Sequence, residues 1–123
     1  MEVKFEILKG KTLKSIKKVG DDEIIFTLKN GDKYKLYHTH ECCEEVYIED
    51  ICGDLKDLVD VPILMAEEST SDDKIENKEP GENNSITWTF YKLATIRGYA
   101  TIRWYGISNG YYSESVDFEK IRD

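Results

Sequence analysis

The alternation of apolar and polar residues predicts three β-hairpins, each with a three-residue loop that ends in glycine. In the first hairpin, a loop over residues 29–31 pairs Phe26 with Tyr34 and gathers the apolar side chains on one face. A two-residue loop would instead mix charged and apolar side chains on that face. Because the buried face fixes the register of a hairpin, the pattern favours the longer loop, with Gly31 in the left-handed conformation.

The second and third hairpins, with loops over 96–98 and 108–110, share a strand and so predict a three-stranded antiparallel meander over 86–118. Its predicted core face carries Trp88, Phe90, Ala94, Ala100, Ile102, Trp104, Tyr112, Val116 and Phe118. Lys92 and Glu114 also fall on this face. They are expected either to pair with each other or to lie at the sheet edge, with the stem of the lysine along the apolar surface.

The remaining segments predict further strands and one short helix. Strands are expected over residues 11–19, 44–51 and 63–68. A helix is expected near residues 55–59, with Asp54 as its N-cap. Residues 67–85 contain few apolar side chains and many turn formers, so they predict a mobile acidic loop within a single domain of residues 1–123. The sequence therefore predicts an α+β fold that is mainly antiparallel β-sheet.

The net charge of −8 is concentrated in the middle of the chain. Residues 1–40 carry +3 and residues 85–123 carry +1, whereas residues 41–84, the acidic belt, carry −12. Such a belt repels nucleic-acid phosphate and attracts basic surfaces. The charge therefore predicts a protein partner with a basic surface rather than a nucleic acid, and it leaves a homo-oligomer open.

Two absences in the sequence bear on where the protein is found. No apolar run approaches the roughly 18 residues of a membrane-spanning helix, and the first residues lack the apolar region of a secretory signal. We therefore expect a cytoplasmic protein with no membrane partner. In a reducing compartment the three cysteines, Cys42, Cys43 and Cys52, are expected to be free thiols.

The stretch HTHECCEEV, residues 38–46, is the densest group of chemically active side chains. His38, His40, Cys42 and Cys43 offer the nitrogen and sulfur ligands that zinc prefers. The same residues suit a Cys–His nucleophile, although the acidic neighbours oppose formation of a thiolate. The competing interpretation is a strand end with a histidine at the edge of the core and small buried thiols.

A second group of acids suggests a site for a hard cation. Glu49, Asp50, Asp54 and Asp57 lie within nine residues, and carboxylates are the ligands that Mg²⁺ prefers. Helix capping by Asp54 and a favourable first-turn charge at Asp57 explain two of these acids without a metal.

The outer face of the predicted meander is the strongest candidate for a binding surface. Tyr91, Arg103 and Tyr105 lie close together on it, and Tyr111 lies near the end of the hairpin. Tyr and Arg are enriched in binding hot spots. The alternative is a solvated sheet face, because exposed strands favour aromatic residues even without a partner.

Three motifs, YHTHECCEEVYIEDICGDLKDL, PILMAEE and WYGISNGYYSESV, make the chain resemble a family of small uncharacterised proteins found in bacteria and their phages. The resemblance covers roughly residues 30–118 and brings no established activity. It implies that relatives share His38 but do not reliably share His40, which weakens any site that needs both. A phage setting would make a host protein the partner, in a bacterium or an infected host cell.

The acidic belt, the Tyr/Arg face and the lack of a catalytic constellation together predict a small binding protein of otherwise unknown function, without a cofactor. The alternative is a metal- or thiol-dependent enzyme that uses His38, Cys42 and Cys43, with zinc as the metal. Metal analysis of protein purified without a chelator would separate the two hypotheses.

Overall fold

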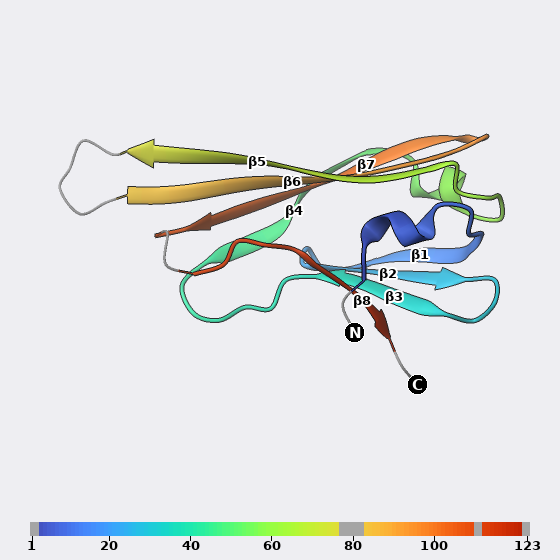
Figure 1. Cartoon of the computed structure of the whole chain (residues 1–123), viewed down its shortest axis with the longest axis horizontal. Coiled ribbons are helices and arrows are strands. Elements are labelled where there is room, and N and C mark those ends of the chain that lie inside the picture. Colours follow the sequence, from blue (N-terminus) through green and yellow to red (C-terminus); the bar gives the residue numbers. More distant parts are fainter. Residues whose placement is uncertain (1–2, 77–82, 110–111, 122–123) are drawn as a thin grey trace.

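The computed structural model describes residues 3–76, 83–109 and 112–121 and arranges their strands in two four-stranded antiparallel sheets (Figure 1). The first sheet has the order β1-β2-β3-β8 and the second the order β4-β7-β6-β5. The first sheet contains β1 (Leu13–Val19), β2 (Glu23–Leu28), β3 (Lys33–Tyr37) and β8 (Asp117–Ile121). The second sheet contains β4 (Glu45–Gly53), β5 (Met65–Glu76), β6 (Asn83–Thr95) and β7 (Gly98–Ser108).

The hairpin β2–β3 has the predicted register. Phe26 pairs with Tyr34, and Gly31 takes a left-handed φ of 96°. Only one face of this hairpin is strongly apolar, so only one register buries it. The predicted strands over residues 11–19 and 44–51 are likewise found, as β1 and β4.

The hairpin β6–β7 is one residue away from the predicted register. Its loop has two residues, because Thr95 pairs with Gly98. The shift turns β6 over, so Trp88 lies on the outer face and Tyr91 is fully buried. Since β6 carries large apolar side chains on both faces, the pattern alone does not select a face. In the observed register the buried hydroxyl of Thr95 donates a hydrogen bond to the backbone oxygen of Asp57, so this polar group is satisfied.

The predicted third strand of the meander is wrong. Residues 112–116 form a loop that leaves the second sheet, and β8 pairs with β3, where Phe118 lies opposite Leu36. The second neighbour of β7 is β4. The C-terminal segment therefore connects the two sheets instead of extending one of them.

The predicted acidic loop over residues 67–85 is wrong where the structure describes it. Residues 67–76 belong to β5 and residues 83–85 to β6, whereas residues 77–82 lie outside the described part. The side chains of residues 67–71 are exposed. Backbone hydrogen bonds to β6 account for this strand. The pattern of apolar residues does not reveal a strand that is held by its backbone alone.

Within the described residues, helical structure is limited to two 3₁₀ turns, η1 (Phe5–Leu8) and η2 (Leu55–Leu58). Asp54 caps η2 as predicted, because its side chain accepts a hydrogen bond from the N–H of Lys56 at 2.9 Å. The fold is accordingly antiparallel β-sheet with 3₁₀ turns, and the α component of the predicted α+β class is not found.

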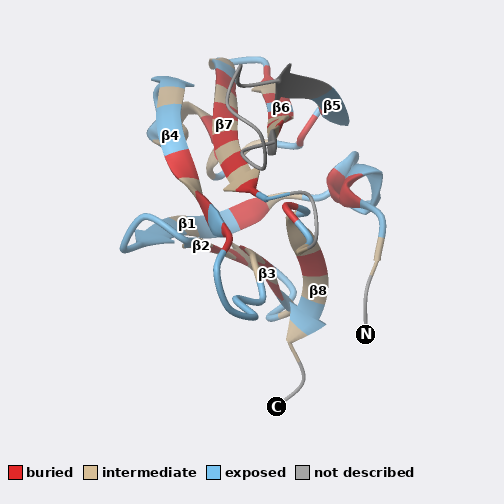
Figure 2. Ribbon diagram, turned by 90° about the vertical axis from the view of Figure 1, so that its left-hand side faces the viewer, coloured by how far each residue is buried: buried red, intermediate tan, exposed pale blue. Residues whose placement is uncertain are grey.

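The buried side chains of both sheets form one apolar cluster. Figure 2 shows buried segments on strands of both sheets, including β4, β7 and β8. Phe5 of η1 is fully buried in this cluster, with its ring centroid 4.7 Å from Tyr91 of the second sheet and 5.3 Å from Phe118 of the first. Edge-to-face contacts of this kind join the two layers.

Candidate functional site

The carboxylate of Glu44 organises the loop of residues 38–44. Its side chain has no solvent exposure. It accepts hydrogen bonds from the backbone N–H groups of Glu41 and Cys42, at 3.1 and 2.9 Å. This part of the loop lies outside the strands, so the side chain supplies the acceptors that its backbone N–H groups require.

These contacts lower the pKa of Glu44 from 4.5 to about 2. The largest cause is the hydrogen bond from the N–H of Cys42, which lowers the pKa. Burial of the carboxylate is the next largest cause and raises the pKa. The N–H groups of Glu44 itself and Glu41, and then the ring of His38, lower the pKa further. Fixed donors therefore stabilise a charge that burial alone would disfavour.

His38 connects this loop to the loop of residues 112–116. Its ring is almost fully buried, with Nε2 3.1 Å from the carboxylate of Glu44 and Nδ1 2.7 Å from the backbone oxygen of Ser115. Both partners accept hydrogen bonds, so both contacts are satisfied only when both ring nitrogens carry protons. His40, in contrast, is largely exposed and reaches only the edge of the site, with Nε2 3.0 Å from the backbone oxygen of Glu44.

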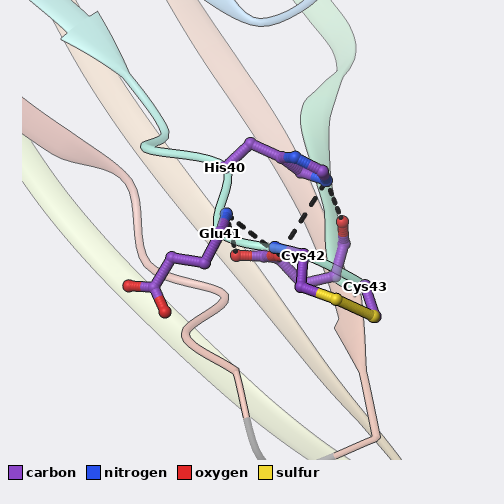
Figure 3. Close-up of a disulfide and its surroundings, with 5 residues drawn as sticks. His40, Glu41, Cys42 and Cys43 are labelled. Carbon is purple, nitrogen blue, oxygen red and sulfur yellow. Dashed lines mark hydrogen bonds and ion pairs between the residues drawn. A yellow bond between two sulfur atoms is a disulfide. The ribbon is translucent and has the colours of Figure 1, made fainter.

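Cys42 and Cys43 form a disulfide between adjacent residues, beside His40 and Glu41 (Figure 3). The prediction of three free thiols is therefore wrong for these two, because the turn of the loop brings both side chains to the same side. Cys52 is free and exposed, and its Sγ lies 3.5 Å from the carboxylate of Asp50.

The geometry gives the predicted metal sites no support within the described part of the chain. No group of three or more His, Cys, Asp or Glu side chains in residues 3–76, 83–109 and 112–121 is placed to hold a metal ion. Two of the four candidate zinc ligands are joined in the disulfide, and His38 contacts Glu44 and Ser115. Among the candidate magnesium ligands, Asp54 caps η2.

A second buried carboxylate, Glu114, holds the loop of residues 112–116 against the second sheet. It accepts hydrogen bonds from the hydroxyls of Thr87 at 2.9 Å and Ser108 at 2.5 Å, and from Ser85 at 3.3 Å. The absence of a side chain at Gly106 permits this approach, because a Cβ there would lie 2.9 Å from the Cβ of Glu114. Of the two alternatives for Glu114 and Lys92, a pair between them is not found, since Lys92 is exposed on the outer face.

The outer face of the second sheet carries an aromatic cluster, here called the aromatic face, formed by Tyr47, Trp88, Arg103 and Tyr105. The ring of Tyr105 lies 4.8 Å from Trp88 and 5.6 Å from Tyr47, and the guanidinium of Arg103 lies 5.2 Å from Trp88. All three rings are half-buried. A neighbouring hollow of about 420 Å³ is lined by Phe90, Arg103 and other residues of the same face.

The structure assembles this face from different residues than the sequence predicted. Arg103 and Tyr105 lie on it as expected. Tyr91 does not, because it is buried in the core and donates a hydrogen bond to Glu68 at 3.1 Å. Tyr111 lies outside the described residues. Trp88, which the apolar pattern assigned to the core, lies on this face because the observed register of β6 differs from the predicted one by one residue.

The fold and these sites define a small protein of antiparallel sheets, with an aromatic outer face and two loops held by buried carboxylates. The chain belongs to the family described as a domain of unknown function (DUF7448), whose model matches residues 6–118. No curated protein and no solved structure matches it. The resemblance to an uncharacterised family is thus confirmed, and an origin in bacteria or phages stays a prediction. No helix in the described ranges is long and apolar enough to cross a membrane.

Proposed function

We propose that the chain is a small protein-binding module that contacts a basic partner protein through the aromatic face. The observation that carries this proposal is the continuous contact of Tyr47, Trp88 and Tyr105 across three strands of one sheet. Half-buried Trp and Tyr rings offer large contact area at low cost in side-chain entropy, which is why they dominate binding hot spots.

Arg103 supports the same surface. Its Nε atom is buried and has no hydrogen-bond partner among the described residues. Its Nη2 atom lies 3.9 Å from the carboxylate of Asp50, which is a long and weak contact between two exposed side chains. An arginine held over a tryptophan ring with donors to spare suits an acceptor on a partner.

The charge around the aromatic face favours a basic partner. Tyr47 lies on β4, within the acidic belt, and its pKa is raised first by burial and then by the nearby carboxylate of Glu49. Negative potential beside stacked rings attracts Lys and Arg and repels phosphate. The resemblance to proteins of bacteria and their phages supports a bacterial host protein as that partner.

A peptide-display selection on the immobilised full chain tests the proposal. We expect enrichment of peptides rich in Lys and Arg, and we expect the Tyr105→Ala variant to lose them. Tyr99→Ala is the matched control, because Tyr99 is 64% exposed on the same strand and lies away from the described ring contacts. Equal enrichment on the Tyr105→Ala variant would overturn the proposal, as would binding of a single-stranded oligothymidine in place of peptides.

A further inference from the structure

The edge strands of the two sheets differ in how far their outer sides are closed. A sheet edge carries unpaired N–H and C=O groups that another strand can join, and proteins block most such edges. On β8, the backbone oxygen of Phe118 accepts a hydrogen bond from the N–H of Val3. On β4, a bulge follows Ile48, whose N–H donates to the backbone oxygen of Asp21. Strand β1 has a bulge and exposed lysines.

Strand β5 lacks such closing features from Ser69 onward. It is the longest of the edge strands, and it pairs with β6 without a shift in register. Element η1 lies against β5, and its Phe5 packs on Tyr91, the residue opposite Glu68. Beyond Glu68, the side chains of residues 69–71 are exposed, and no hydrogen bond within the described part of the chain joins their backbone to an element other than β6. The open edge therefore begins at Ser69.

The charge of β5 decides which kind of strand suits this edge. Residues 67–76 carry five acids and one lysine, so their net charge is −4. The β5 strand of a second copy would place −4 beside −4, and like charges on neighbouring strands are destabilising. A basic segment would place opposite charges across the new pair. The charge therefore favours an extended basic segment of another protein.

The outer side of β5 leads directly to the aromatic face. Ser71 pairs with Trp88 and Ser69 pairs with Phe90, so two small side chains separate the edge from these rings. Neighbouring strands lie about 4.8 Å apart, so a strand added to β5 would lie roughly 10 Å from β6. Long cationic side chains on that strand can extend over the serines toward Trp88, whose half-buried ring already contacts the guanidinium of Arg103.

We propose that an extended basic segment of the partner protein adds to β5 as a fifth strand of the second sheet and directs alternate Lys or Arg side chains over Ser69 and Ser71 to the aromatic face. This inference rests on the function proposed above and adds to it how the partner is held. In strand addition, backbone hydrogen bonds supply affinity, and side chains at every second position supply selectivity.

Titration of the full chain with a blocked peptide of four Lys-Val repeats, followed by backbone amide NMR, tests the proposal. Two further peptides carry N-methyl groups on all of the lysines or on all of the valines. An added strand directs only one of these two sets of N–H groups toward β5. We therefore expect one methylated peptide to bind like the parent and the other to bind about tenfold more weakly. Alternate β5 amides from Ser69 onward should gain protection from exchange when the parent binds.

A lysine on the proposed edge provides the matched pair of variants. Ser71→Lys should weaken binding of the parent peptide about threefold, because it sets like charges side by side. Ser15→Lys is the control, since Ser15 is an exposed serine on β1, the edge strand of the other sheet. The proposal is overturned if the parent does not saturate, if Ser15→Lys weakens binding as much as Ser71→Lys, or if self-association already protects the β5 amides.

The Tyr105→Ala variant separates this inference from the function on which it rests. If the variant loses the parent peptide and both methylated peptides bind wild type equally, the aromatic face is upheld and strand addition is overturned. If the variant keeps the parent peptide and one methylated peptide fails on wild type, strand addition is upheld and the role of the aromatic face is overturned.

Discussion

Glu44 and Glu114 are both buried carboxylates, and each holds one of two loops that meet at His38, yet they are stabilised by different kinds of donor. Glu44 accepts from backbone N–H groups and an imidazole ring. Glu114 accepts from three side-chain hydroxyls. The first set of donors is fixed in place by the backbone, whereas the second can rotate.

This difference decides how far each loop depends on a negative charge. A backbone N–H can only donate, so an amide NH₂ placed against it leaves two donors facing each other. A hydroxyl can turn and accept instead. The loop of residues 38–44 therefore requires the charge of Glu44, and the loop of residues 112–116 requires only the shape of Glu114 and one acceptor.

Replacing each glutamate by glutamine is the most direct way to break the comparison. We expect Glu44→Gln to lower Tm by about 6–10 °C and Glu114→Gln to lower it by less than about 3 °C. Amide exchange at Cys42 should accelerate in the first variant only. Glu41→Gln is a neighbouring control with an exposed side chain. Equal losses at Glu44 and Glu114 would mean that the type of donor does not matter.

His38 is the residue that contacts both loops, and its replacement should have the next largest effect. His38→Phe keeps much of the ring volume but removes both ring nitrogens, and with them the contacts to the carboxylate of Glu44 and the backbone oxygen of Ser115. We expect a fall in Tm of about 4–6 °C. The side chain of His40 is 63% exposed. We therefore expect His40→Phe to lower Tm by less than half as much as His38→Phe. A larger loss at His40 would show that its contact with the backbone of Glu44 anchors the loop.

How far the sequence predicts the fold depends on whether a strand has one apolar face or two. The β2–β3 register follows from its pattern because a slip would bury lysines. The β6–β7 register does not, since Trp88 and Tyr91 are both large and lie on opposite faces of one strand. Only the start of β5 is predictable from apolar content, because the predicted strand over residues 63–68 overlaps it from Met65 onward, whereas the side chains of residues 67–71 are exposed.

The candidate sites show the same limit at the level of single residues. The sequence draws attention to His38, and the structure confirms that it is buried at a junction. The residue that it contacts, Glu44, is one of several acids in the stretch, and only the turn of the backbone brings the N–H of Cys42 onto it. A pair between Glu114 and Lys92 is considered only because an incorrect register places Lys92 on the same face.

Acidification should remove the contribution that the charge of Glu44 makes to stability. The pKa of Glu44 lies at about 2 in the folded chain, below the ordinary value of 4.5, so its contribution to stability is complete above pH 4.5 and is lost as the pH falls toward 2. The pKa of Asp60 is also lowered, mainly by Lys29, and it adds to the same loss. The difference in free energy of unfolding between wild type and Glu44→Gln isolates Glu44. We expect this difference to be constant from pH 7 to 4.5 and to shrink below that, and a constant difference down to pH 2 would contradict the assignment.

The disulfide between Cys42 and Cys43 should have the smallest effect. A disulfide stabilises a protein chiefly by restricting the unfolded chain, and a bridge between neighbours restricts almost none of it. We expect reduction, or the Cys42→Ser/Cys43→Ser double variant, to change Tm by less than about 2 °C, because the N–H of Cys42 still bonds to Glu44 without the bridge. Thermal unfolding with and without dithiothreitol measures this, and Cys52→Ser controls for the free thiol. A fall as large as that of Glu44→Gln would show that the bridge, and not the carboxylate, sets the shape of the loop.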